Sequence, residues 1–282
     1  MRIKQLHTCN ATNHFHQRLL KRYKLNSITN FRESLISFGL YVDEEISFNK
    51  LLSSEGLTVI IWGGSDAMRI LYDKNKNKLE KIRNKKNMRH IAISNFIHHD
   101  LLKANIEHVC IPITQTNEEY FCNTKLGNKI FYYNNHNVKK KEFYGVYKTE
   151  KILKKYFPEI ETETGYSTGS GHILYEQMSS IYEKCFMGIR LTPHDGLSNV
   201  VVEMGLMGRN VIWNGIAPNA IKWSSEKDII ETIIQEKKKI GSFQNDVSDN
   251  MKKFINIGDE WLYVDFYNKE NWKKNINKYI YV

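Results

Sequence analysis

The chain has 282 residues, of which 41% are hydrophobic and 26% charged, and its formal net charge is +10. This composition excludes an intrinsically disordered chain, and the length suits one large or two ordinary domains. No apolar run approaches the ~18 residues of a membrane helix. The 4 cysteines lie far apart, without the spacing of a metal site, and indicate free thiols in a reducing compartment.

The positive charge does not by itself predict a nucleic-acid partner. The basic runs are dispersed and are not interleaved with aromatic residues as in nucleic-acid modules. We therefore expect no nucleic-acid partner, and a nucleic-acid-associated protein stays open as a hypothesis that charge alone supports. The first residues lack the charged segment and apolar run of a signal peptide. We expect a cytoplasmic protein with no integral membrane segment.

Short apolar strands alternate with helical patterns through the first half of the chain. This alternation predicts a parallel sheet with helices on both faces. In chain order the expected elements are strand 2–6, helix 14–23, strands 35–40 and 58–62, helix 67–72, strand 90–93, helix 95–104 and strand 109–112.

The second half repeats the alternation after a polar, irregular segment at 112–129. The spacing of Met178, Ile181, Tyr182 and Cys185 predicts a helix over 172–186. The other expected elements are strand 129–133, helix 148–156, strand 188–192, helix 199–207, strand 210–213, helix 228–239 and a terminal helix near 270–279. The predicted fold is α/β, with two Rossmann-like βαβ domains facing across a cleft. The domains are expected at 1–122 and 123–282, with the terminal helix packing back on the first.

The most informative stretch runs from Met187 to Gly215 and reads as strand, polar loop, short helix and strand. Asp195 opens the loop and Glu203 lies in the helix, with seven residues between them. The unpaired N–H groups of a first helical turn suit a phosphate, and a carboxylate one turn further on suits the hydroxyls of a ribose. The pattern suggests a nucleotide-sugar donor site. The expected contacts around the phosphates are Gly196, Leu197, Ser198 and Asn199, with His194 donating to a phosphate or a sugar hydroxyl.

Each of these residues also has a structural interpretation. The loop reads equally as an ordinary connection with an Asp-Gly turn. Ser198 suits the N-cap position, where its hydroxyl would accept from the N–H of a residue near Val201. Glu203 can lie on an exposed face of its helix, and His194 can be a hydrogen-bonded structural histidine.

Two loops of the first half follow strand ends, where open α/β sheets bind ligands. Gly64 and Ser65 precede Asp66, which could accept a proton from an acceptor hydroxyl or could cap the following helix. Asn10 and His14 belong to a His/Asn-rich loop that could line an acceptor site. Metal binding by this loop lacks a carboxylate or a paired ligand spacing, so a polar loop with a helix cap is the alternative.

Asn134 and Tyr144 lie at and after the end of the second half's first strand. An aromatic ring there could stack on a base, or could serve packing alone. The sequence holds no phosphate-binding glycine loop of the familiar kinds, no zinc-protease motif and no D-x-D pair. We therefore expect no metal site and no cofactor, with phosphate held by N–H groups and basic side chains.

The segment from Asp195 to Ile212 resembles the donor-site signature of retaining GT-B glycosyltransferases of the family-4 type. In that signature an acid, a glycine, a hydrophobic residue and a small residue come first, and a glutamate follows with seven residues between it and the acid. Asp195 stands where Glu is usual, and Asn199 where an aliphatic residue is common. Residues 94–111 also resemble the segment that ends the family's first domain. The compact size and the Asn/Lys bias are similar to those of giant-virus glycosyltransferases.

The resemblance implies an acceptor-side first domain and a second domain that binds a nucleoside diphosphate sugar. Carried over, Glu203 would hold the ribose hydroxyls and Asp195 would contact the sugar ring. The N–H groups of 196–198 would hold the diphosphate. The implied reaction retains the anomeric configuration by front-face attack, and the leaving phosphate takes the acceptor's proton.

We therefore expect a metal-independent, hexosyltransferase-like enzyme that transfers a sugar to a hydroxyl of a glycan, protein or lipid. Asp195, His194 and Asp66 are the expected catalytic residues. The alternative is a non-catalytic nucleotide- or glycan-binding module of the same fold, which the substituted Asp195 motivates.

Overall fold

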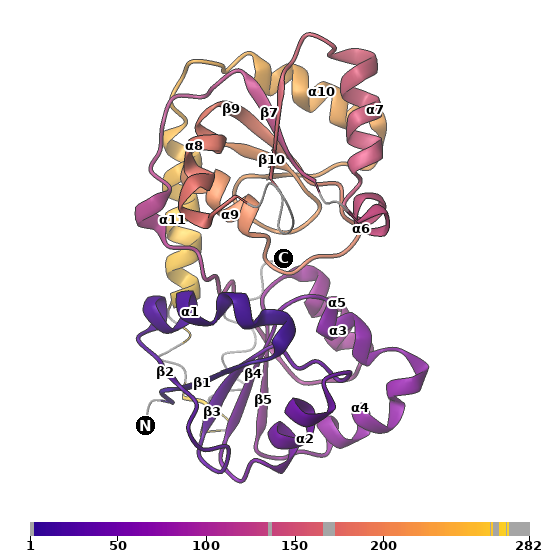
Figure 1. Ribbon diagram of the computed structural model, residues 1–282, viewed down its shortest axis with the longest axis vertical. Coiled ribbons are helices and arrows are strands. Elements are labelled where there is room, and N and C mark those ends of the chain that lie inside the picture. Colours follow the sequence, from indigo (N-terminus) through magenta and orange to yellow (C-terminus); the bar gives the residue numbers. More distant parts are fainter. Residues whose placement is uncertain are drawn as a thin grey trace. The chain divides into compact units, whose positions relative to one another are not determined.

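The computed structural model describes residues 3–134, 137–165, 173–259, 261, 265–268 and 270. These residues form two compact units (Figure 1). The first unit takes the described residues of 1–115, 194–197 and 255–282, and the second takes those of 116–193 and 198–254. The chain thus first passes between units at Gln115, whereas the sequence places the domain limit at 122/123.

A six-stranded parallel sheet forms the centre of the first unit. Its strand order is β2-β1-β3-β4-β5-β6. Every residue of β3 and β4 is buried, as expected for parallel strands that helices cover on both faces. The strands are β1 (Gln5–Thr8), β2 (Asn26–Ser27), β3 (Leu35–Phe38), β4 (Thr58–Trp62), β5 (Met88–Ala92) and β6 (Val109–Cys110).

Helices follow most of these strands. Two of them, α2 and α4, were not expected from the sequence. The buried residues of α4 are Leu79 and Ile82, and its other six residues are polar. Its apolar face is therefore too narrow to stand out in the sequence. The helices of this unit are η1 (Asn10–Phe15), α1 (His16–Tyr23), α2 (Glu45–Ser53), α3 (Ser65–Ile70), η2 (Asp73–Asn75), α4 (Lys76–Arg83) and α5 (Asn95–Lys103).

The second unit contains a five-stranded parallel sheet in the order β11-β10-β9-β7-β8. Alternate residues of β7 point to opposite faces. Ile130 and Tyr132 join the core that α7 and α10 also line, whereas the ring of Phe131 meets Tyr182 of α8. The strands are β7 (Lys129–Tyr133), β8 (Thr162–Gly165), β9 (Cys185–Ile189), β10 (Asn210–Ile212) and β11 (Ala220–Ile221).

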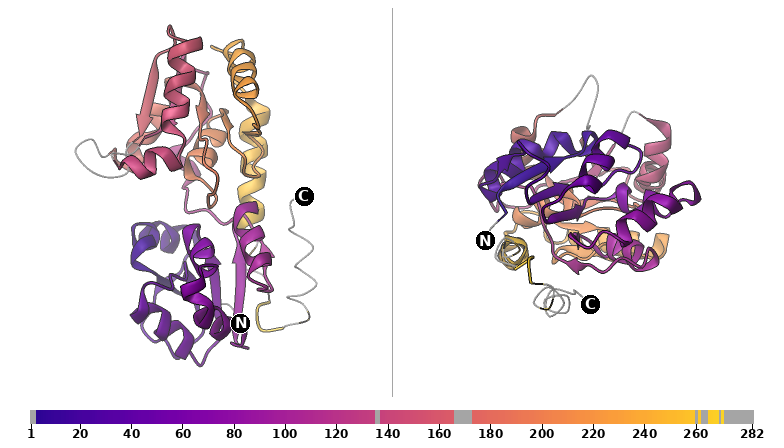
Figure 2. Two further views of the ribbon diagram at one scale, coloured as in Figure 1. Left: turned by 90° about the vertical axis from the view of Figure 1, so that its right-hand side faces the viewer. Right: turned by 90° about the horizontal axis from the view of Figure 1, so that it is seen from below.

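Helix α11 begins in the second unit and ends in the first, because the two units divide it at Phe254 and Ile255. Figure 2 shows it as one continuous helix in yellow. The helices that begin in the second unit are η3 (Glu118–Tyr120), α6 (Val138–Phe143), α7 (Val146–Tyr156), η4 (Tyr175–Gln177), α8 (Met178–Glu183), α9 (Asn199–Leu206), α10 (Glu226–Lys237) and α11 (Asn245–Asp259).

The structure corrects one pair of expected elements. The sequence predicts a helix over 172–186 and a strand over 188–192, but α8 ends at Glu183 and β9 starts at Cys185. All five residues of β9 are buried, so the apolar run carries no alternation that could mark its start. The terminal helix expected near 270–279 lies outside the described residues, except for Glu270.

Candidate functional site

Both sheets have a topological switch point, where consecutive crossovers leave in opposite directions. In the second unit it lies between β7 and β9, which pair in register with Tyr132 opposite Ile189. The residues that follow the two strands, Asn134 and Arg190, therefore lie at the same carboxyl edge. Ligands of open α/β sheets bind at this place, so the edge is the candidate site.

Arg190 provides a buried positive charge at this edge. Its side chain lies with its guanidinium carbon 4.7 Å from the ring centre of Tyr144 and 5.3 Å from that of Tyr133. Arg190 and Asn134 are 8% and 7% exposed. Sequence reasoning missed Arg190 because it sits in an apolar run that was assigned to a strand interior. An arginine within such a run, just ahead of a polar loop, was the available signal.

Glu203 is buried and paired. Its Oε2 accepts a hydrogen bond from the hydroxyl of Tyr182 at 2.9 Å, and the two residues are 3% and 0% exposed. Burial and the adjacent carboxylate raise the pKa of Tyr182. The sequence left an exposed helix face open for Glu203, and that alternative is wrong. A buried carboxylate requires compensating partners, and Tyr182 of α8 is one of them.

The N-terminus of α9 follows the loop after β9. Ser198 occupies the N-cap position with extended backbone, as predicted, and its carbonyl accepts from the N–H of Val202. Its hydroxyl makes no cap bond, however. Within the part of the chain that the structure describes, Ser198 Oγ is buried and has no hydrogen-bond partner. A buried hydroxyl without a partner is costly, and a ligand oxygen at this helix end would satisfy it.

The loop His194–Leu197 groups with the first unit. His194 Nε2 lies 2.7 Å from Asp100 Oδ2 of α5, so the histidine is held by a buried carboxylate. Ser94, at the N-cap of α5, donates its hydroxyl to the carbonyl of Asp195 at 2.9 Å. Helix α5 therefore holds two positions of the loop. The bond to His194 agrees with the alternative of a hydrogen-bonded structural histidine, whereas the sequence assigned no partner to Asp195.

Gly196 has a structural reason to be glycine. A Cβ built there would lie 2.2 Å from the carbonyl oxygen of Gly63, so the loop backbone passes directly against the end of β4. The sequence predicts that the backbone at Gly196 approaches a ligand closely. In the structure the backbone at Gly196 approaches the backbone of Gly63.

Asp66 lies inside helix α3, whose N-cap is Gly64, so it is not the helix cap that the sequence left open. It is completely buried. Its carboxylate accepts from the backbone N–H groups of Gly64 at 2.8 Å, Leu40 at 3.1 Å and Gly63 at 3.2 Å. Burial raises the pKa of Asp66, and the backbone hydrogen bonds oppose that rise. This carboxylate joins two strand-end loops, and its expected role as a proton acceptor stays a prediction.

The residues expected to bind an acceptor follow β1 and β4, whose carboxyl ends lie at one edge of the first sheet. Asn10 and His14 are exposed, and the backbone N–H of Asn10 donates to Glu44 at 2.8 Å. Ser65 is half-buried, with its hydroxyl 3.5 Å from that of Tyr41, and Gly64 is buried. The fold thus brings these two predicted loops to the same edge.

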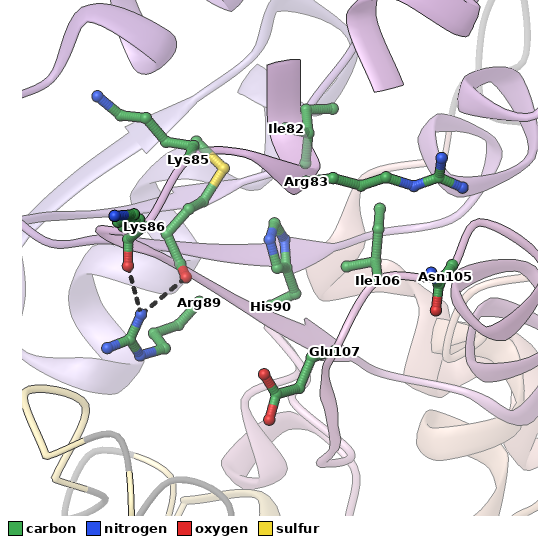
Figure 3. Close-up of a pocket in the computed structure, with 10 residues that line it drawn as sticks. Ile82, Arg83, Lys85, Lys86, Arg89, His90, Asn105, Ile106 and Glu107 are labelled. Atoms are coloured by element: carbon green, nitrogen blue, oxygen red, sulfur yellow. Dashed lines mark hydrogen bonds between the residues drawn. The ribbon is translucent and has the colours of Figure 1, made fainter. Parts of the chain in front are cut away.

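Two pockets lie on the part of the first unit that the structure describes. One of about 220 Å³ is lined by basic residues that precede β5 (Figure 3). There Arg89 donates to the carbonyls of Lys86 and Met88, both at 3.0 Å. The second, of about 360 Å³, shares Asn105 and Ile106 with the first.

No protein-family model and no curated protein matches this chain. Solved structures do resemble it. TarM from S. aureus shares a TM-score of 0.58 at 14% identity, covering 84% of this chain and 55% of TarM. A trehalose-6-phosphate synthase matches with a TM-score of 0.57 at 10% sequence identity. The match covers 91% of this chain and 79% of the synthase. Anabaena HepE in complex with UDP and glucose matches with a TM-score of 0.55 at 7% sequence identity. The match covers 90% of this chain and 82% of HepE. The chain has the GT-B fold.

The GT-B assignment confirms the fold class expected from the sequence, with one parallel sheet in each unit. The chain spans about half the length of TarM. Among the described residues, none of the helices is long and apolar enough to cross a membrane.

Proposed function

We propose that this chain is a glycosyltransferase that moves a sugar from a nucleoside diphosphate sugar to an acceptor hydroxyl. The observation that carries the proposal is the switch point of the second sheet. Buried Arg190, the N-terminus of α9 and buried Glu203 follow one strand there, and they supply a cation, helix-end N–H groups and a carboxylate. The GT-B fold supports the same chemistry.

The donor's groups are assigned by their charges. Glu203 binds the ribose hydroxyls, and its hydrogen bond from Tyr182 holds the carboxylate in place. The N–H groups of Gly196, Leu197, Ser198 and Asn199 bind the diphosphate together with the Ser198 hydroxyl. Arg190 neutralises charge that builds up on the leaving diphosphate. Asn134 and Tyr144 border the base and the sugar.

We propose transfer with retention, in which the acceptor attacks the face that the diphosphate leaves. The leaving phosphate takes the acceptor's proton, so no enzyme nucleophile and no Mg²⁺ or Mn²⁺ is required. Asp195 contacts the sugar ring, and His194 donates to a phosphate or a sugar hydroxyl while Asp100 fixes its ring. The acceptor, a glycan, protein or lipid, meets Asn10, His14, Gly64 and Ser65. Asp66 holds the loop of Gly64 and Ser65 by accepting from the backbone N–H groups of Gly63 and Gly64.

A thermal-shift screen against nucleotide sugars of different base and sugar tests the donor class. A ligand that binds only the folded chain at a concentration 100 times its Kd adds about 2.7 kcal/mol to the free energy of unfolding. We expect a rise in Tm for one base, enhanced by one sugar, without added Mg²⁺ or Mn²⁺. Turnover is then followed by release of the nucleoside diphosphate. Binding without turnover on any acceptor would favour the non-catalytic module.

Two matched variants separate the roles of Glu203. Glu203→Gln keeps an acceptor for the Tyr182 hydroxyl but loses the charge, whereas Tyr182→Phe keeps the carboxylate and loses the hydrogen bond. We expect Glu203→Gln to weaken nucleotide-sugar binding and to abolish transfer with little change in stability. Tyr182→Phe should cost about 1–3 kcal/mol of stability but retain measurable transfer. Calorimetry measures nucleotide-sugar binding, and chemical denaturation measures stability. Normal turnover by Glu203→Gln would refute the assignment of Glu203 to the donor site.

A further inference from the structure

Three metal-binding side chains gather on the first unit, at its edge strand β6. His98 lies on α5, His108 precedes β6, and Cys110 ends β6. One ligand atom of each lies within 4.8 Å of the other two. The cluster arises because β6 pairs beside β5, whose following helix is α5. The spacing 98, 108 and 110 matches no familiar motif, so the sequence predicted no metal here.

The hydrogen bonds define which nitrogen of His108 is free to bind a metal. Its Nδ1 lies 2.7 Å from the carbonyl oxygen of Ile106, which can only accept, so Nδ1 carries the proton. Nε2 is then the unprotonated nitrogen, and it lies 2.8 Å from His98 Nδ1. A backbone carbonyl that fixes the tautomer in this way is the usual outer partner of a metal-bound histidine.

The third ligand completes a compact donor set. Cys110 Sγ lies 3.2 Å from His98 Nδ1. Ligand atoms around a tetrahedral Zn²⁺, with Zn–N near 2.0–2.1 Å and Zn–S near 2.3 Å, are separated by about 3.3–3.6 Å. The separations of 2.8 and 3.2 Å to His98 Nδ1 are shorter than this, so the side chains would move apart by about half an ångström to admit the ion.

The cluster also has an access route. His98, His108 and Cys110 all line the pocket of about 360 Å³. His108 is buried, and the other two are half-buried at the pocket wall. A metal site needs such an entry path, and the pocket leaves room for a water as the fourth ligand.

We propose that His98, His108 and Cys110 bind one Zn²⁺ ion, with its fourth position facing the pocket. Two imidazoles and one thiolate form the mixed nitrogen and sulfur set that suits zinc rather than magnesium or calcium. The ion ties α5 to the edge strand β6. The same helix holds the loop His194–Leu197 through Ser94 and Asp100, so the metal steadies that loop without contacting the reacting groups.

The test uses the full chain, reduced and stripped of metal with a chelator. Co²⁺ is added first, because a thiolate ligand produces a near-ultraviolet charge-transfer band and a tetrahedral site produces intense visible bands. Zn²⁺ should then displace Co²⁺ at one ion per chain. Cys110→Ser and His108→Gln should each weaken Zn²⁺ binding by more than the ~10–100-fold that losing an outer partner costs.

Matched controls are Cys122→Ser, at an exposed free cysteine, and His99→Gln, at the exposed neighbour of His98. Both should keep the cobalt spectrum and the zinc affinity of the parent chain. Circular dichroism shows whether the ligand variants fold. The spectrum of the parent chain decides the matter even if they do not, since absence of a thiolate–cobalt band overturns the proposal. A band that Cys122→Ser removes and Cys110→Ser retains also overturns it.

Discussion

In each unit, a buried carboxylate near the carboxyl ends of the strands is held by hydrogen bonds. Asp66 gathers backbone N–H groups in the first unit, and Glu203 accepts from Tyr182 in the second. His7 is 8% exposed, with its ring nitrogens 3.0 Å from the Ser37 hydroxyl and 3.4 Å from that of Ser47. In each case burial is costly for the charged or polar group, and specific hydrogen bonds offset part of the cost.

The burial of His7 makes stability depend on pH. Burial lowers the pKa of His7 from 6.5 to about 4. Between these values the unfolded chain binds a proton that the folded chain does not, so the free energy of unfolding falls as pH drops from 6.5 to 4. The stabilisation is complete above pH 6.5, and at pH 5 the loss from this residue is about 2 kcal/mol. His90, whose pKa burial lowers to about 3, acts in the same direction.

Urea denaturation at a series of pH values measures this effect. Between pH 4 and 6.5, the free energy of unfolding of His7→Asn should change less steeply with pH than that of the parent chain, by the contribution of one proton. This holds whatever the substitution does to stability at pH 7. The exposed His99, changed to Asn, is the matched control and should leave the slope unaltered. An unchanged slope in His7→Asn would show that His7 is not the group responsible.

At the scale of elements, the Ser94 hydroxyl at the N-terminus of α5 makes two hydrogen bonds with different roles. Ser94 Oγ accepts from the N–H of Ile97 at 3.3 Å, which caps the helix, and donates to the carbonyl of Asp195 at 2.9 Å. The cap is local and follows from sequence, as serine before a helix is favoured. The bond to the loop joins residues about a hundred positions apart.

Two nearly isosteric variants divide these functions. Ser94→Asn and Ser94→Asp both supply a capping oxygen, so their free energies of unfolding should agree within about 0.5 kcal/mol. Only asparagine can also donate to the Asp195 carbonyl. We expect faster amide hydrogen exchange in the loop 194–197 in Ser94→Asp than in Ser94→Asn. Equal exchange in the two variants would mean that this hydrogen bond does not hold the loop.

At the scale of the whole molecule, the last residues that the structure describes belong to the unit that holds strand β1. Arg22 of α1 pairs with Asp259 at 2.9 Å. The Trp261 ring packs edge-on against Tyr23 with ring centres 5.5 Å apart. Trp261 is only 1% exposed, so this is core packing. Asp259 and Trp261 therefore help to stabilise the first unit.

This arrangement predicts which unit responds to a change near the C-terminus. Trp261→Ala should destabilise the first unit by about 3–5 kcal/mol, because it removes a large buried side chain. Amide exchange should quicken in β1 and β3–β5 while β7, β9 and β10 keep their protection. Tyr267→Ala, at a residue 42% exposed, should change neither. Equal loss of protection in both units would contradict the assignment.

The sequence alone predicted what short-range patterns encode. Strands 58–62 and 129–133 were predicted with their observed limits, since turn residues or charge bound both apolar runs. Helix α9 was predicted to within one residue, because Ser198 marks its start. The sequence also placed Glu203 and the loop before α9 in a candidate donor site, which stays a prediction.

Only the tertiary structure decided which distant residues meet. Tyr182 beside Glu203, Asp100 beside His194, and the cluster of His98, His108 and Cys110 each join different elements. Local periodicity reports which face of an element is apolar, but not which element covers that face. Strand order and packing, which no local pattern encodes, bring these partners together.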